Sequence, residues 1–173
     1  YYNLPINKDG FYNLMELSYK RDMALYQNSF IASPYLSFNV KEITEKLLAD
    51  YIFFNIRNPV ETIESFHKKG WYLYFDKIEN LQSPLIDITT NQHRSFSRII
   101  PKGEYLKEWL SLSRIGKITW FWAITNKSIY EDFANIDDVG KYYIKLEDID
   151  QNYKFYEKLA EEFSFEKKMT KNS

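Results

Sequence analysis

The sequence predicts an α/β fold in three layers, with a mainly parallel sheet flanked by helices. The first reason is the stretch 51–56, which is apolar almost without interruption, as in strands covered on both faces. The second is a helical pattern that begins directly after it, at Pro59. The third is a second strand pattern at 142–146, followed by an amphipathic helix over 152–163. Strands that alternate with helices in this way are typical of parallel sheets.

Apolar residues at helical spacing predict most of the remaining elements. Besides the helix after Pro59, helices are expected over 11–26, 38–49, 104–112, 118–133 and 152–163. A brief buried strand is expected at 29–33, and 71–75 fits either a helix or a strand. Prolines and polar residues predict a loop over 82–103, and we expect 167–173 to be a frayed tail.

Composition narrows the classes of function. The 173 residues suit a single domain spanning 1–173, and aromatic residues reach 18%. A net charge of -1 argues against bulk binding to nucleic acid or to anionic membranes. The chain has no cysteine, which excludes disulfides, thiolate zinc sites and a cysteine nucleophile. With no signal peptide and no long apolar run, we expect a cytoplasmic protein.

The stretch most informative about function joins the strand 51–56 to the helix after it. Arg57 follows the strand directly, Asn58 and Pro59 start the helix, and Ser65 comes eight residues after Arg57. Ligands of open α/β sheets bind at this edge, where Arg57 could hold a phosphate in a bidentate manner. The alternative is that Arg57 pairs with a nearby carboxylate and Ser65 is an ordinary helix residue.

This stretch resembles the 3′-phosphate-binding element of sulfotransferases that use 3′-phosphoadenosine 5′-phosphosulfate (PAPS). In that family a strand is followed by Arg-Asn/Asp-Pro and then by a Ser eight residues after the Arg. Residues 31–34 are similar to the Lys-Ser-Pro strand end of bacterial members, and 145–149 to the Arg-Tyr-Glu-Asp-Leu strand end. The aromatic stretch 120–126 is similar to the helix before that strand, so the resemblance covers about 29–165.

The resemblance implies a P-loop-like fold, incomplete at its N-terminus, and transfer of a sulfuryl group from PAPS to a hydroxyl or amine. It implies that Arg57 and Ser65 hold the 3′-phosphate, with Asn58 and Pro59 completing that element. Leu146 stands where the family has a Tyr that contacts adenine. The implied partners are this nucleotide co-substrate and a small-molecule or glycan acceptor, with no metal ion, nucleic acid or membrane.

The chain also departs from the family pattern. The family's Gly-rich loop, which cradles the 5′-phosphosulfate, has no counterpart before Ser29, and Gly10 lacks its chemistry. The chain begins with Tyr1 rather than Met, so we expect the first strand and loop of the family to be missing from it. A second copy of the chain would then be one way to cover an exposed sheet edge. The segment 114–119, which superficially suggests a phosphate loop, is interpreted as a helix junction.

The catalytic base is not assigned by the sequence. His67 and His93 are weak candidates, because an imidazole can accept the proton of an acceptor hydroxyl. His93 belongs to a basic loop that could approach an anionic donor or acceptor; its other members are Arg94, Arg98 and Lys102. The alternative is that this segment is an ordinary solvated surface loop. Two functional alternatives stay open: a catalytically incomplete relative that binds nucleotide or a protein partner, and, less favoured without a Walker-type loop, a kinase relative.

Overall fold

A computed structural model describes residues 13, 16–17, 19–21, 34–73, 99–151 and 153–163. The elements follow one another as η1 (Pro34–Phe38, a 3₁₀ helix), α2 (Val40–Leu47), β1 (Tyr51–Ile56), α3 (Pro59–Lys68), α5 (Tyr105–Ser111), α6 (Arg114–Ala134), β2 (Gly140–Lys145), α7 (Leu146–Gln151) and α8 (Tyr153–Glu162). Residues 13, 16–17 and 19–21 are helical, in agreement with the predicted helix over 11–26. The predicted strand at 29–33 and most of the predicted loop over 82–103 lie outside the described residues.

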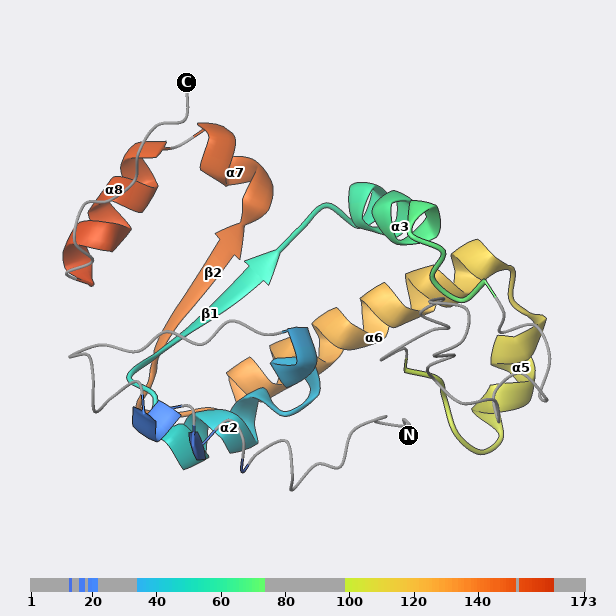
Figure 1. The fold of residues 1–173 in the computed structure, drawn as a ribbon, viewed down its shortest axis with the longest axis horizontal. Helices are drawn as coiled ribbons and strands as arrows, with labels where there is room; N and C mark the ends of the chain where they lie inside the picture. Colours follow the sequence, from blue (N-terminus) through green and yellow to red (C-terminus); the bar gives the residue numbers. More distant parts are fainter. Residues whose placement is uncertain are drawn as a thin grey trace.

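The sheet consists of two parallel strands in the part of the chain that the structure describes. Tyr51 of β1 is opposite Gly140 of β2, and the pairing continues in step to Ile56 opposite Lys145. Figure 1 shows the two arrows side by side, pointing toward α7 and the start of α3. Because the strands are parallel, the segments that follow Ile56 and Lys145 meet at one edge of the sheet.

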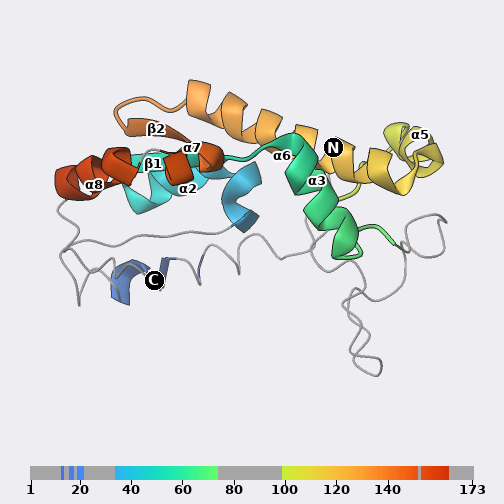
Figure 2. The same cartoon turned by 90° about the horizontal axis from the view of Figure 1, so that it is seen from above.

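Helical segments cover both faces of this small sheet. On one face Phe54 packs against Phe133 of α6, with 5.7 Å between the ring centroids. On the other face the ring of Phe163, at the end of α8, lies 5.3 Å from that of Phe53. Figure 2 shows α6 on one side of the strands and α8 on the other. Phe54 is buried, whereas Tyr51 and Asn55 on the other face are exposed, so the cover predicted for both faces is complete on one face only.

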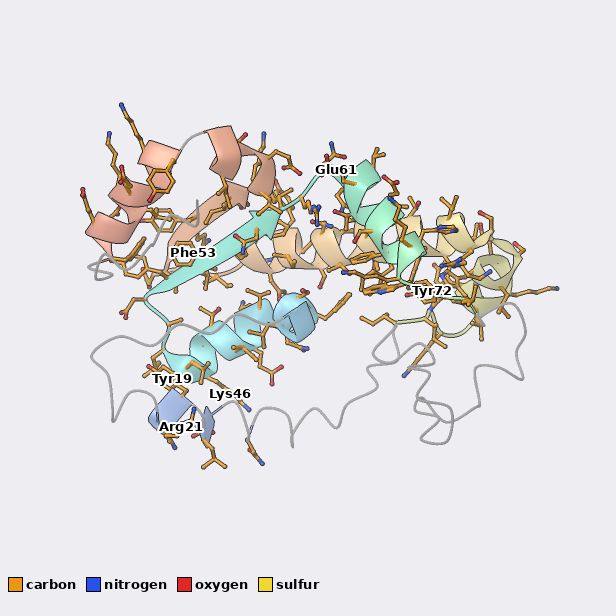
Figure 3. The ribbon with its side chains drawn as sticks, turned by 45° about the horizontal axis from the view of Figure 1, so that its top comes forward. Tyr19, Arg21, Lys46, Phe53, Glu61 and Tyr72 are labelled. Atoms are coloured by element: carbon orange, nitrogen blue, oxygen red, sulfur yellow. The ribbon has the colours of Figure 1, made fainter. Side chains whose placement is uncertain are left out.

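A second packed region surrounds the opposite end of α6, away from the sheet. Its buried residues are Tyr72, Ile100, Trp109 and Ile118, and Figure 3 shows Tyr72 at this end of the molecule. The Tyr72 hydroxyl donates a hydrogen bond of 2.5 Å to the carbonyl of Ile99, which satisfies its polar end. Trp109, which is 2% exposed, is a central member of this core. Helix α6 therefore connects the aromatic region to the sheet.

The segment 114–119 forms the first turns of α6. The Ser113 hydroxyl accepts a hydrogen bond of 3.1 Å from the Gly116 N–H and so caps the helix. The buried Lys117 ammonium donates to the carbonyls of Leu110 and Leu112, where α5 ends. The interpretation of this segment as a helix junction is therefore confirmed, because the Lys117 ammonium joins the start of α6 to the end of α5.

The structure confirms mixed helices and parallel strands, and it corrects several predicted boundaries. The second strand covers Gly140–Lys145, so the prediction that Leu146 belongs to it is wrong. Leu146 starts α7 instead, with Glu147 and Asp148 in the first turn, where acidic side chains favour a helix N-terminus. Helix α6 begins at Arg114, earlier than the predicted residue 118, because Ser113 caps it. Residues 71–73 form a turn rather than a helix or a strand.

Candidate functional site

Most of the predicted binding residues gather where the two parallel strands end. The last pair in register is Ile56 with Lys145, and the chain continues from there into α3 and α7. We call this place the strand-end edge; its residues are Arg57, Asn58, Pro59, Leu146 and Glu147. Figure 3 shows Glu61 at the start of α3, next to the ends of the strands. Two segments that are far apart in the sequence thus form one surface.

Asn58 fixes the start of α3. Its side-chain oxygen accepts a hydrogen bond of 2.9 Å from the Val60 N–H, and Pro59 occupies the first helical position. The Thr62 hydroxyl donates a bond of 2.8 Å back to the Asn58 carbonyl. A capping Asn followed by Pro is a strong helix start, because the Asn side chain accepts an N–H of the first turn and Pro has no N–H to satisfy. The predicted helix after Pro59 is confirmed.

Glu147 links this helix start to the second strand. Its carboxylate accepts a hydrogen bond of 2.5 Å from the backbone N–H of Asn58. That bond is the largest cause that lowers the pKa of Glu147 below 4.5, and the residue's own N–H, Arg57 and Lys145 act in the same direction. Glu147 is therefore a negative charge held at the N-terminal end of α3, where the helix dipole favours an anion.

Arg57 is held only loosely. Its guanidinium Nη2 lies 3.8 Å from the Glu61 carboxylate, and the two side chains are 47% and 58% exposed. An exposed ion pair at this separation stabilises the fold by less than about 1 kcal/mol. The alternative reading, in which Arg57 pairs with a nearby carboxylate, is thus seen in the structure. The weakness and exposure of the pair leave the guanidinium accessible to a ligand.

Ser65 lies on the same row of α3 as Glu61, one turn further along the helix. It comes eight residues after Arg57 and six after Pro59, which is about 9 Å along the axis of α3 from the helix start. The contact with Glu61 places the Arg57 guanidinium beside α3, one helical turn before Ser65. Ser65 is half-buried, and its carbonyl accepts a bond of 3.0 Å from the Lys69 N–H, within the helix end.

Leu146 and the two histidines differ in how they relate to this edge. Leu146 belongs to it and is 43% exposed, which leaves its side chain open to an apolar contact. His67 lies at the far end of α3, about 12 Å along the helix from Pro59. The structure therefore does not bring His67 to Arg57. His93 lies outside the described residues, as do Arg94 and Arg98, while Lys102 is exposed.

Two connections at the ends of α3 were not predicted from the sequence. One is the bond from Asn58 to Glu147; the other comes from Arg114 at the start of α6. The Arg114 guanidinium donates from Nε to the Trp71 carbonyl at 2.9 Å, and from Nη2 to the His67 carbonyl. The acidic residues Glu147 and Asp148, shortly after a strand pattern, were a visible signal for the first connection. No local pattern pointed to Arg114 as a partner of α3.

Comparison with known proteins adds no relative. No family model, curated protein or solved structure matches the chain. In the described ranges, no three acidic or histidine side chains are grouped as metal ligands would be. None of the described helices combines the length and apolar character needed to cross a membrane.

Proposed function

We propose that the chain is a sulfotransferase-type protein that binds PAPS at the strand-end edge, within a P-loop-like fold. Arg57 and Ser65 hold the 3′-phosphate of the nucleotide, Asn58 and Pro59 shape the turn, and Leu146 packs against the adenine. One observation carries the proposal: the exposed Arg57 guanidinium lies beside α3, one turn before Ser65, and is held only by a weak contact of 3.8 Å with Glu61. The resemblance in residues 57–65 and 145–149 supports it.

In the proposed reaction, the bond between sulfur and the bridging phosphate oxygen of PAPS breaks. A new bond forms between sulfur and the oxygen or nitrogen of the acceptor, and the acceptor's proton passes to a base. Such transfers depend on positioning and on electrostatic stabilisation of the moving group. The contribution of Arg57 is to position the nucleotide through its 3′-phosphate, at a distance from the sulfur. The acceptor is a small molecule or a glycan.

One observation favours a second candidate, a nucleotide-binding or interaction module without catalysis. The described glycines lie in two turns (Gly70 and Gly103), in helix α6 (Gly116) and in β2 (Gly140). None of these four belongs to a glycine-rich loop between a strand and a helix, which is the structure that cradles a 5′-phosphosulfate. Sulfuryl transfer from labelled PAPS to a panel of phenols, amines and sugars separates the two candidates.

Nucleotide binding is tested by calorimetric titration with 3′-phosphoadenosine 5′-phosphate and, separately, with AMP. We expect a preference for the nucleotide with the 3′-phosphate, and an affinity loss of about tenfold or more in Arg57→Ala. Lys127→Ala is the matched control, because Lys127 forms an exposed pair with Glu131 of the same i,i+4 kind on α6. Equal affinity for both nucleotides, or equal losses in both variants, would contradict the proposal.

A further inference from the structure

The positive charge at the strand-end edge is already opposed by two carboxylates of the chain itself. Glu61 lies 3.8 Å from the Arg57 guanidinium, and the field of Arg57 also reaches Glu147. The two carboxylates differ in one respect. Glu61 is a freely exposed helix side chain, whereas Glu147 is fixed on a backbone N–H by a bond of 2.5 Å.

Glu147 occupies a backbone N–H at the start of α3, the end of a helix at which anions bind. An anion at a helix N-terminus is held by unpaired backbone N–H groups and by the dipole. The Val60 N–H is used by the Asn58 side chain, and the Asn58 N–H is used by Glu147. Glu147 thus occupies the donor next to Arg57, and a phosphate that approached Arg57 would also meet its negative charge.

We propose that Glu147 is a built-in competitor for the anionic ligand of the strand-end edge. This inference rests on the proposed function for the identity of the site, and it adds how the site selects its ligand. A free inorganic anion meets an occupied N–H and a repelling carboxylate. A nucleotide phosphate overcomes this because its base and sugar add contacts of their own, and Glu147 then turns away from Asn58. Glu147 therefore lowers the affinity of every anion at this edge, and only a ligand with further contacts of its own binds well despite it.

Glu147→Gln tests this inference in the 173-residue chain. Glutamine keeps an oxygen that can accept the Asn58 N–H, so the variant removes the charge while retaining the hydrogen bond. The probes are inorganic phosphate and 3′-phosphoadenosine 5′-phosphate, each compared with chloride at equal ionic strength. We expect both phosphates to bind about two- to fivefold more tightly than to the wild type, the effect of one partly screened surface charge.

The matched control is Glu61→Gln, which removes the other carboxylate near Arg57 and leaves the Asn58 N–H occupied. The Asn58 amide signal in nitrogen-15 NMR spectra provides a second measurement. In Glu147→Ala it should shift on addition of inorganic phosphate, and in the wild type and Glu61→Gln it should respond much less. If Glu147→Ala does not fold, the phosphate affinities of Glu147→Gln decide whether the competitor role holds.

The outcomes separate this inference from the proposed function. If Arg57 is required for nucleotide binding but Glu147→Gln binds no more tightly than the wild type, the competitor role is overturned and the function stands. An equal gain in Glu61→Gln also overturns it, because a general charge effect would then suffice. If Glu147→Gln gains affinity for inorganic phosphate while the nucleotide with a 3′-phosphate binds no better than AMP, the competitor role stands and the function fails.

Discussion

The backbone N–H of Asn58 donates a hydrogen bond of 2.5 Å to the Glu147 carboxylate, although 89 residues separate the two in the chain. This bond fastens the start of α3 to the start of α7. It also places a negative charge beside Arg57, where the resemblance to PAPS-dependent sulfotransferases implies a bound phosphate. The relation between these two residues therefore affects both the stability of the fold and the chemistry of the proposed site.

Stability at acid pH should depend on Glu147. Its pKa in the folded protein lies below the ordinary 4.5, chiefly because of the hydrogen bond from Asn58. A lowered folded pKa adds stability that is present above pH 4.5 and is lost as the pH falls through the folded pKa. Urea unfolding of the wild type and Glu147→Gln should show a difference near neutral pH that shrinks in this acid range. Parallel pH profiles would contradict the assignment.

Removal of the α3 cap should weaken the fold. Asn58→Ala deletes the oxygen that accepts the Val60 N–H, and we expect unfolding to become easier by about 1 kcal/mol. Asn58→Ser keeps a capping oxygen and should recover most of this loss. Both values come from urea unfolding monitored by circular dichroism. Equal losses in the two variants would show that the cap does not stabilise α3.

Arg114 should hold the C-terminal end of α3 against α6. It donates to the carbonyls of His67 and Trp71, so Arg114→Met leaves two carbonyl groups without these donors. We expect a loss of about 1.5–3 kcal/mol and faster hydrogen exchange of the amides at 67–71. Lys127→Met, which alters an exposed pair on the same helix, should change neither quantity appreciably. Unchanged exchange at 67–71 in Arg114→Met would be inconsistent with this role.

Gly140 should be sensitive to a single added methyl group. A Cβ atom at this position would overlap with Cδ1 of Tyr51, whose ring contacts Phe163 at a centroid distance of 4.6 Å. Gly140→Ala must displace the Tyr51 ring, and we expect a loss of about 1–3 kcal/mol in unfolding free energy. The same change in a Tyr51→Ala background should cost clearly less. An equal cost in both backgrounds would place the strain elsewhere.

Local sequence patterns predicted the elements that bury an apolar surface. The stretch 51–56 is predicted as a strand because nearly every side chain in it is apolar, and the structure shows β1 over that range. The pattern failed where polar contacts decide a boundary. Residues 114–117 carry few apolar side chains in helical register, but Ser113 caps them and Lys117 is held by carbonyl groups of α5.

The candidate site could be predicted only in part, for a related reason. Arg57, Asn58, Pro59 and Leu146 do share the strand-end edge, because the carboxyl ends of parallel strands meet. The pairing of Arg57 with a nearby carboxylate was predicted as an alternative, but the sequence did not identify which carboxylates lie around it. Glu61 reads as an ordinary exposed helix residue, and the distance in sequence hides the contact of Glu147 with Asn58. Such contacts depend on the three-dimensional path of the chain.

The parallel pairing of β1 with β2 has a consequence for the order of folding. Closing a loop of the size that separates Tyr51 from Gly140 costs about 4 kcal/mol of chain entropy before any contact compensates for it. Phe133 of α6 and Tyr143 of β2, by contrast, are near in sequence and pack with ring centroids 5.4 Å apart. We therefore expect α6 and β2 to dock early in the folding transition state and β1 to join late. In stopped-flow measurements, truncation of Phe133 should slow refolding, whereas truncation of Phe53 should mainly accelerate unfolding.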